Sequence, residues 1–427
     1  MTNTLCQHPF IHYQQNQLFV ENLSVHSLAA QYGTPLYVYS KAALLTAVNA
    51  YQTALAAQKH LICYSVKANS NIALLQLIAQ TGCGFDIVSG GELQRVLAAG
   101  AQPEKIVFSG VGKTPDEMCM ALEAGIKCFN IESTAEVDTL AGIAKAMGKQ
   151  ASISLRVNPD IDAKTHPYIS TGLKNNKFGI AFEQALDTYL HAAKQPELNI
   201  TGIDCHLGSQ ITEVEPYLEA FDKLAQLVQQ LSAAGITLSH LDLGGGLGIT
   251  YKNETPPSIE TLYSAVLARM QQHGLGHMKL LVEPGRSIVG NAGILVTEAL
   301  YIKPGESKNF CIVDAAFNDL ARPALYEAYH GIVEVQKSVK PGLSLRYDVV
   351  GPICESSDYL GHDRDLVVQQ GDMLAVLSAG AYGKSMASNY NSRPRAAEVL
   401  VDDDTVHLIA ERERLDSLYA NERLIKV

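Results

Sequence analysis

Between about residues 60 and 285, short runs of β-branched and aromatic residues alternate with stretches whose apolar residues recur at helical spacing. The stretch from Phe221 to Leu231 carries one apolar stripe, and Gly235 follows it as a helix-ending residue. Eight strands are predicted, at Leu61–Val66, Gly84–Val88, Lys105–Phe108, Lys127–Ile131, Ser152–Val157, Ile200–Cys205, His240–Leu243 and Lys279–Val282. This part of the chain is therefore expected to form eight strand–helix units in series.

Parallel strands need crossover helices and covered faces, so eight such units favour a closed (β/α)8 barrel of the α/β class. An open, doubly wound sheet is the alternative. In a barrel of this kind the chemistry lies at the carboxyl ends of the strands. The residues that directly follow each predicted strand are therefore the first candidates for function.

After about residue 290 the pattern changes to short strand-like runs without long helices between them. These runs are Gly293–Leu300, Phe310–Val313, Tyr347–Val350, Met373–Leu377, Val399–Val401 and Val406–Ile409. We expect a second, mainly antiparallel β domain, a sandwich or barrel, which the strand-like N-terminal residues join. The predicted division assigns residues 36–285 to the barrel, and residues 1–35 and 286–427 to the β domain.

The formal net charge is −11, from 44 acidic and 33 basic residues, and the sequence has no block of consecutive Lys or Arg. These features argue against a general binder of nucleic acid or of an anionic membrane. No run reaches the roughly 18 apolar residues of a membrane helix, and the N-terminus lacks a signal-peptide pattern. The eight cysteines are scattered without a Cys-x-x-Cys pair, which predicts reduced thiols in a cytoplasmic protein and no metal site.

Two of the segments at the strand ends suggest covalent chemistry and anion binding. Lys67 follows the first predicted strand, where desolvation favours the neutral amine that a Schiff-base lysine needs. A lysine that merely extends from a strand end into solvent is the alternative. Gly244–Gly246 follow the seventh strand, where backbone N–H groups can approach an anion closely. A tight strand-to-helix turn would have the same composition.

Two more strand ends carry groups that suit a planar, basic ring. His206, after the sixth strand, can stack on such a ring, or it can be a core histidine. Glu283, after the eighth strand, can keep a pyridine nitrogen protonated, or it can pair with Arg286. Each signal is weak alone. Together, a lysine for an imine, a glycine cradle for phosphate, an acid for a ring nitrogen and an aromatic plate predict a site for pyridoxal 5′-phosphate.

These motifs resemble those of the group IV, fold-type III pyridoxal-phosphate decarboxylases, and the resemblance runs over nearly the whole chain. The matching segments are Tyr64–Asn69, Gly84–Glu92, His206–Gln210, Gly244–Gly248, Glu283–Arg286, Arg322–Tyr326, Gly351–Asp358 and Gly380–Gly383. The resemblance implies an alanine-racemase-like barrel with a β domain. It also implies a homodimer whose two active sites are each built from both subunits.

The resemblance further implies a role for individual residues. The implied catalytic residues are Lys67, His206 and Cys354. The implied cofactor-binding residues are Lys67, Asp86, His206, Ser209, Gly244, Gly245, Gly246, Glu283, Gly285, Arg286 and Tyr382. The implied substrate-binding residues are Arg286, Arg322, Tyr326, Glu355 and Tyr382. Cys354 and Glu355 would reach the site from the partner subunit.

Within the family the resemblance is strongest to the branch that converts meso-2,6-diaminopimelate to L-lysine and CO2, a step of lysine biosynthesis. Ornithine-type members usually have Asp where Glu355 stands, and their substrates lack a distal carboxylate. A buried carboxylate beside arginines matches a substrate with an ammonium and a carboxylate at its far end. The alternatives are a decarboxylase of another basic amino acid or of carboxynorspermidine, an amino-acid racemase, and a non-catalytic cofactor-binding protein.

One further segment suggests a moving part. The stretch near Thr165–Lys177 is rich in Asn, Lys and Gly. It is expected to be either a lid over the site or an ordinary surface loop.

Overall fold

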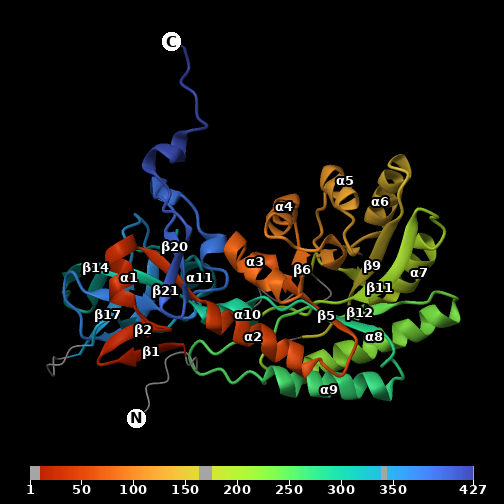
Figure 1. The fold of residues 1–427 in the computed structure, drawn as a ribbon, viewed down its shortest axis with the longest axis horizontal. Coiled ribbons are helices and arrows are strands. Elements are labelled where there is room, and N and C mark those ends of the chain that lie inside the picture. The colour runs from red at the N-terminus through yellow and green to blue at the C-terminus, as the bar shows by residue number, and fades with distance from the viewer. Residues whose placement is uncertain (1–9, 163–175, 338–343, 427) are drawn as a thin grey trace. The chain divides into compact units, whose positions relative to one another are not determined.

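A computed structural model of the chain describes residues 10–162, 176–337 and 344–426. It divides the chain into two compact units (Figure 1). The barrel unit comprises residues 47–249 and 255–287, and the β unit comprises residues 1–46, 250–254 and 288–427. Most of the segment expected to be a lid or a surface loop, residues 165–175, lies outside the described residues. That expectation therefore stays a prediction.

The barrel unit contains a ring of eight parallel strands. They are β5 (His60–Ser65), β6 (Gly84–Ile87), β7 (Ile106–Phe108), β8 (Cys128–Ile131), β9 (Ala151–Asn158), β11 (Leu198–Asp204), β12 (His240–Asp242) and β13 (Lys279–Val282). Each strand pairs with the next, and β13 pairs with β5, which closes the ring. The short strand β10 (Ile180–Ala181) pairs with β9. All eight predicted strands are present, and the closed barrel is confirmed.

Helices lie between successive strands and cover the outside of the ring (Figure 1). They are α3 (Ile72–Gln80), α4 (Gly90–Ala98), α5 (Pro115–Ala124), α6 (Thr134–Ala146), α7 (Phe182–Ala192), α8 (Glu215–Ala233) and α9 (Ile259–Gln272). Serine or threonine side chains cap the starts of α4, α5, α6 and α9. The predicted stripe on α8 is buried, and Gly235, at φ +82°, follows the helix as expected.

The β unit is built on a mainly antiparallel sheet. Its strands are β4 (Leu36–Ser40), β14 (Gly293–Lys303), β15 (Asn309–Val313), β16 (Ile332–Glu334), β17 (Leu345–Val350), β18 (Tyr359–Leu366), β19 (Met373–Val376), β20 (Ala397–Asp402) and β21 (Thr405–Ala410). Parallel pairing occurs between β15 and β17 and between β20 and β4. The six predicted strands are present, and β4, β16 and β18 are additional strands that the sequence pattern did not predict.

The N-terminal residues add a small sheet of β1 (Ile11–Gln14), β2 (Gln17–Val20) and β3 (Leu23–Ser24), followed by helix α1 (Val25–Tyr32). The backbone N–H of Leu18 donates to the carbonyl of Val335 at 2.8 Å. Buried residues of β2, β4, β14 and β20 share one apolar core. Packing and hydrogen bonding therefore tie this segment to the rest of the β unit.

The boundary between the units lies later than the sequence suggested. Strand β4 pairs with β14 and β20 of the β unit, and helix α2 (Lys41–Ala54) leads from one unit into the other. The division therefore falls between residues 46 and 47 instead of 35 and 36. The pairing partners of β4 are some 250 and 360 residues away in sequence, so local pattern could not assign it. No helix in the described part of the chain is long and apolar enough to span a membrane.

Candidate active site

Lys67 lies in a single 3₁₀ turn, Val66–Ala68, directly after β5. Its Nζ is 3.2 Å from Oδ2 of Asp86, which is itself buried in β6. The Ser65 hydroxyl donates to the same oxygen at 3.0 Å. Its position after an apolar strand predicts a desolvated lysine, but the Lys67 side chain is about a third exposed and is held by an ion pair. Asp86 thus fixes the position of the amine.

His206 follows β11 and is neutral. The pKa of its imidazole lies well below the usual value because burial disfavours the cation, and the charges of Lys67 and Arg156 act in the same direction. Nδ1 accepts a hydrogen bond from the backbone N–H of Gly245 at 3.2 Å. An Nδ1 that accepts must be unprotonated, so the ring carries its proton on Nε2. The Glu283 carboxylate oxygen 3.9 Å away therefore faces a neutral ring.

The glycines that follow β12 and β13 lie in two closely packed turns. We name these residues, Gly244, Gly245, Gly246 and Gly285, the glycine cradle. A Cβ atom on Gly245 would lie 2.0 Å from the carbonyl oxygen of Glu283, and one on Gly246 would lie 2.4 Å from that of Gly208. Gly244 and Gly246 also have positive φ angles, +64° and +99°. Only glycine fits these positions, because both space and backbone conformation exclude a side chain.

The cradle is also suited to an anion. Within the described residues, the backbone N–H groups of Gly246, Leu247 and Gly285 have no hydrogen-bond acceptor. Arg286 begins the short helix α10 (Arg286–Val289), is buried, and donates from Nη2 to the Ser209 hydroxyl at 2.9 Å. Backbone donors without internal acceptors match the needs of a phosphate group. These residues fit the phosphate of pyridoxal phosphate.

Replacing Gly245 by alanine tests the cradle. The added methyl group would meet the Glu283 carbonyl, so we expect a loss of about 1–3 kcal/mol in the free energy of unfolding and a much weaker cofactor affinity. Urea unfolding and cofactor titration measure both. The matched control is Gly142→Ala in α6, where no atom lies within 4 Å of the new Cβ. It should be neutral or slightly stabilising. Unchanged cofactor affinity in Gly245→Ala would contradict the assignment.

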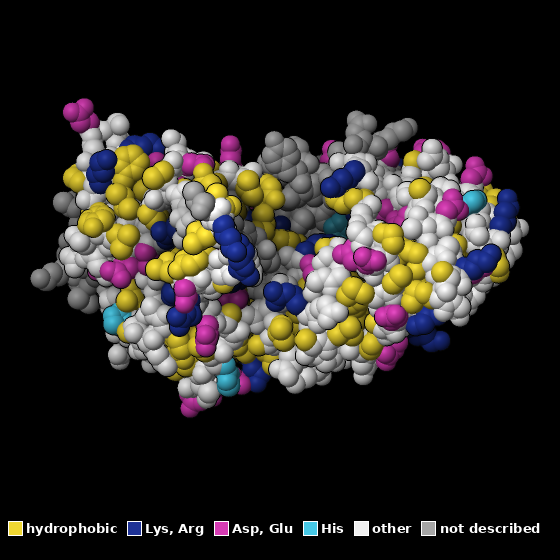
Figure 2. Space-filling view, turned by 90° about the horizontal axis from the view of Figure 1, so that it is seen from above, with side chains coloured by type: hydrophobic (Ala, Val, Ile, Leu, Met, Phe, Trp, Pro, Cys, Tyr) yellow, Lys and Arg dark blue, Asp and Glu magenta, His cyan; other side chains and the backbone are white. Residues whose placement is uncertain are grey.

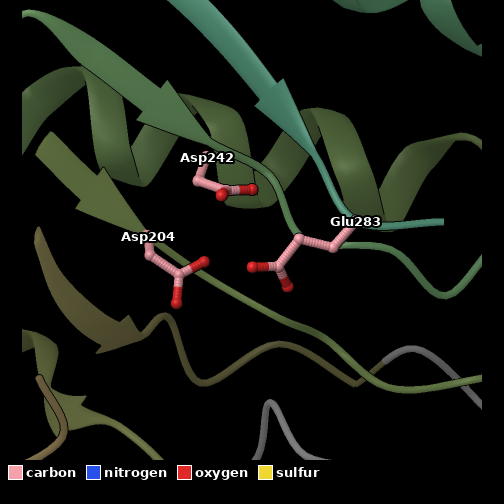
Figure 3. A group of neighbouring side chains, drawn as sticks. All are labelled: Asp204, Asp242 and Glu283. Atoms are coloured by element: carbon pink, nitrogen blue, oxygen red, sulfur yellow. The ribbon is translucent and has the colours of Figure 1, made fainter. Parts of the chain in front are cut away.

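Three buried carboxyl groups meet at the ends of adjacent strands (Figure 3). They are Asp204, Asp242 and Glu283, at the ends of β11, β12 and β13, and they are 1%, 0% and 3% exposed. One oxygen of each lies within 4.8 Å of one oxygen of the other two. Glu283 is among the residues predicted from the sequence, whereas the two aspartates are not. The sequence did contain a signal for them. Side chains two residues apart along a strand point to the same face, and Asp204 and Asp242 stand two residues before His206 and Gly244.

The charges of this carboxyl cluster (Asp204, Asp242 and Glu283) are only partly compensated. Burial raises the pKa of Glu283 well above its usual value, and the nearby acids Asp86, Asp242 and Asp204 add to that effect. Asn130 donates from Nδ2 to Glu283 Oε1 at 3.3 Å. The buried guanidinium of Arg156 attracts Asp204 and Glu283, but its hydrogen bond, at 3.0 Å, goes to Glu132. Burial and the mutual repulsion of the three acids therefore favour their protonated forms.

In the β unit, Arg322 is held in a fixed position at the start of helix α11 (Arg322–Tyr326). Its Nη1 donates to Nε2 of His330 at 2.7 Å, and Nδ1 of His330 donates to the carbonyl of Leu377 at 2.8 Å. The guanidinium stacks over the ring of Tyr251, 4.6 Å from its centroid. Tyr326, the last residue of the same helix, is partly buried. Arg322 is thus a buried cation with a defined orientation.

Cys354 and Glu355 lie on an exposed loop of the β unit, within Gly351–Asp358. Asp358 shapes this loop, because its carboxylate accepts hydrogen bonds from the backbone N–H groups of Phe317 and Ile353, both at 2.7 Å. Glu355 accepts a hydrogen bond from the Tyr390 hydroxyl. Among the cysteines that the structure describes, Cys354 is the exposed one, whereas most of the others are buried. Cys354 is therefore a solvent-accessible thiol and not a buried core residue.

Tyr382 has an unusual backbone. Its φ angle is +57°, in the left-handed region that side chains other than glycine rarely adopt. The strain costs on the order of 1–3 kcal/mol and persists only where the surroundings impose it. The next residue, Gly383, could not carry a Cβ, which would lie 2.6 Å from the Ala379 carbonyl. This local constraint is consistent with a functional role for Tyr382.

The surface shows no concentration of positive charge on the face that Figure 2 presents, where Lys and Arg side chains are dispersed among acidic and apolar ones. Few of the predicted site residues are positively charged, and Arg322 and Arg286 are both buried single cations.

The barrel, the glycine cradle, Lys67 and the acidic residue Glu283 together define the class of protein: a pyridoxal-phosphate enzyme of the barrel type. A family model described as "Pyridoxal-dependent decarboxylase, pyridoxal binding domain" matches residues 41–290.

Comparison with known proteins narrows this class. The chain is 52% identical to diaminopimelate decarboxylase of Vibrio cholerae over 97% of its length and 99% of the relative. It is 56% identical to that of Neisseria meningitidis, covering 95% of this chain and 98% of the relative. A crystal structure of the Helicobacter pylori diaminopimelate decarboxylase complexed with L-lysine superposes with a TM-score of 0.89 at 44% identity, covering 93% and 98%. The chain belongs to the diaminopimelate decarboxylase family.

Proposed function

We propose that this protein decarboxylates meso-2,6-diaminopimelate to L-lysine and CO2, and so serves lysine biosynthesis. The observation that carries the proposal is the identity of 52–56% over nearly the full length of relatives named diaminopimelate decarboxylase. The site residues of the barrel unit support it, since they offer every group that pyridoxal phosphate requires. When bound, the cofactor accepts the electron pair that the departing carboxylate leaves behind.

The residues of the barrel unit have the following proposed roles. Lys67 would hold the cofactor aldehyde through Nζ, and its amine is the group that the substrate amine would replace. Asp86 holds the lysine, and neutral His206 would lie against the ring face. The glycine cradle, with Ser209 and Arg286, would bind the phosphate, and Glu283 would keep the ring nitrogen protonated. A neutral imidazole suits the ring face because it adds no positive charge beside a protonated ring.

The residues of the β unit are proposed to select the substrate. Arg322 and Tyr326, with Arg286 and Tyr382, bind the distal carboxylate, and Glu355 binds the distal ammonium. Arg322 is buried and has a fixed orientation, which supports this role, because its side chain loses little conformational entropy when it binds a carboxylate. Cys354 or Lys67 returns a proton to the substrate carbon after CO2 has left, and we favour the exposed thiol of Cys354.

We further propose a homodimer in which Cys354 and Glu355 of each subunit complete the site of the other. Their exposure on the surface of the chain supports this arrangement, because an exposed thiol and carboxylate can reach a neighbouring molecule. The protein is proposed to act in the cytoplasm. The described cysteines are free thiols, which fits a reducing compartment.

The decisive test is CO2 release from meso-diaminopimelate by the purified protein loaded with pyridoxal phosphate. Ornithine, arginine, lysine and carboxynorspermidine are measured beside it. We expect release from meso-diaminopimelate far above that from the others. Preferential release from another substrate would replace the proposed one, and loss of stereochemistry without CO2 would indicate a racemase. Cofactor binding without any turnover would indicate a non-catalytic protein.

Arg322→Ala tests the substrate contact. A hydrogen bond to a charged group contributes about 1.5–3 kcal/mol, so KM for meso-diaminopimelate should rise by roughly 10- to 150-fold. The absorption spectrum of the bound cofactor should not change. The matched control is Arg346→Ala, which removes an arginine of the β unit that is two-thirds exposed and pairs with Asp365. It should leave KM unaltered. An Arg322→Ala protein with normal KM would remove this residue from the substrate site.

A further inference from the structure

His330 is a fully buried histidine of the β unit to which the proposed reaction assigns no role. Its Nε2 is 2.7 Å from Nη1 of Arg322, and its Nδ1 is 2.8 Å from the carbonyl oxygen of Leu377. A guanidinium offers only donors and a carbonyl oxygen only accepts, so Nε2 must accept and Nδ1 must donate. The two partners therefore fix the imidazole in its neutral form, with the proton on Nδ1.

The sheet of the β unit fixes the position of this ring. The backbone N–H of Leu377 donates to the carbonyl of Gly331 at 2.8 Å, and strands β16 and β19 pair directly beyond these two residues. Arg364 donates from Nη2 to the backbone carbonyl of His330 at 3.0 Å. Both the backbone and the ring of His330 are thus held by the β unit, and the ring in turn gives Arg322 an acceptor at a defined place.

A second ring lies beside the same guanidinium. The ring of Tyr251 is inclined at 77° to that of His330, with the two centroids 5.2 Å apart. Its centroid lies 4.6 Å from Cζ of Arg322. An aromatic face attracts a cation through its quadrupole and carries no net charge. Neither the imidazole nor the phenol ring neutralises the charge of Arg322.

A neutral acceptor suits an arginine that has to bind a carboxylate. A carboxylate in the place of His330 would neutralise the guanidinium and compete with the carboxylate of a ligand. The imidazole sets the direction of the guanidinium, uses one of its N–H groups and leaves the charge in place. Since recognition of a carboxylate by arginine depends on the orientation of the planar guanidinium, this direction affects how tightly the carboxylate is bound.

We propose that His330 is a positioning residue that sets the selectivity for a substrate with a distal carboxylate, because it holds Arg322 in the orientation that such a carboxylate requires. The inference rests on the proposed function, in which Arg322 binds that carboxylate. The alternative is a histidine that only fills the core of the β unit. Such a residue would contribute to stability but would not change KM through Arg322.

The test compares His330→Asn with His330→Gln. The asparagine amide takes the place of Nδ1 and can donate to Leu377 but does not reach Arg322, whereas the glutamine oxygen reaches the place of Nε2. We expect His330→Asn to raise KM for meso-diaminopimelate about tenfold, with kcat within about threefold of the wild type. His330→Gln should recover most of the wild-type KM. The control is His407→Asn, the same substitution at an exposed position of β21, which should change neither constant.

A double-mutant cycle shows whether His330 acts through Arg322. If it does, adding His330→Asn to Arg322→Ala should change KM by less than about twofold, whereas independent effects would multiply. The free energies of unfolding of the same four proteins, without cofactor or substrate, should also be non-additive, because the two side chains are in direct contact.

Multiplying effects on KM, additive unfolding free energies, or equal KM values for the Asn and Gln variants would each overturn the positioning role. Absence of CO2 release from meso-diaminopimelate by the wild type would instead overturn the proposed function, and the unfolding cycle would still decide whether His330 holds Arg322. If the His330 variants do not fold, NMR spectra of the imidazole nitrogens decide. The histidine signal displaced by Arg322→Ala should belong to a neutral ring protonated on Nδ1, and a proton on Nε2 would end the proposal.

Discussion

Replacing Lys67 by alanine is expected to lower kcat on the order of 10³-fold or more, because it removes both the covalent link to the cofactor and a group that can move a proton. The absorption band of the lysine–cofactor imine should disappear. In the wild type, borohydride should fix the cofactor on Lys67, and peptide mapping identifies the labelled residue. A label on another lysine would contradict the assignment.

The matched control for this variant is Lys41→Ala. Lys41 also pairs with an aspartate, Asp402 at 2.6 Å, but it lies in the β unit and both side chains are partly exposed. An ion pair of that kind contributes about 0–1 kcal/mol to stability, so activity should be unaffected. If both variants lost activity equally, the loss would reflect folding and not chemistry.

Lys67→Ala also tests the shared active site. Mixed with Cys354→Ala protein, it should form hybrid dimers in which one site has both intact residues. Random pairing at equal concentrations gives half of the dimers as hybrids, so about a quarter of the wild-type activity should return. Each variant measured alone serves as the control. Absence of any recovery after confirmed subunit exchange would contradict the proposed contribution of Cys354 from the partner subunit.

Glu283→Gln is the second substitution with a large expected effect. Glutamine keeps the shape and the hydrogen bond from Asn130 but cannot carry the charge that stabilises a protonated ring. Removal of one such electrostatic contact in an active site typically costs about 10²–10³ in kcat. Cofactor affinity should fall much less, and the pH dependence of the cofactor spectrum should shift to lower pH. Equal losses in affinity and turnover would instead indicate a structural role.

The same variant should not be less stable than the wild type. Glu283 is buried among Asp86, Asp204 and Asp242, so a neutral isostere removes repulsion and desolvation cost. Because the pKa of Glu283 is raised on folding, its contribution to the free energy of unfolding declines as pH rises above the usual glutamate value. Glu283→Gln should therefore show a weaker decline of stability above pH 5 in urea titrations. Glu260→Gln, at an exposed position in the first turn of α9, is the neutral control.

The local sequence pattern was sufficient to predict those parts of the candidate site that lie within short segments of the chain. The apolar strands of the barrel, the lysine after β5 and the glycines after β12 each have a signature within a window of a few residues. The β unit was harder to assign. Strand β4 takes its partners from the far end of the chain, and β18 has the polar run Gly361-His362-Asp363-Arg364 in its centre, which does not indicate a strand.

The charges of the site required the folded barrel. Asp204, Asp242 and Glu283 are separated by about 40 residues each along the chain, and only the pairing of β11, β12 and β13 brings their carboxyl groups together. The neutrality of His206 and the ion pair of Lys67 with Asp86 likewise depend on burial and on neighbours from other strands. A segment considered apart from the folded barrel has neither the low-dielectric surroundings nor the neighbouring charges that determine these protonation states.

The sequence by itself thus determined the barrel architecture, because strand pattern and glycine turns are local properties, and it was enough to propose the cofactor-binding residues and the chemistry. The tertiary structure alone decided the boundary at β4, the tautomer of His206, the orientation of Arg322 by His330, and the assembly of the carboxyl cluster. These features arise from contacts between residues far apart in the chain, and electrostatic energies depend on distances in space.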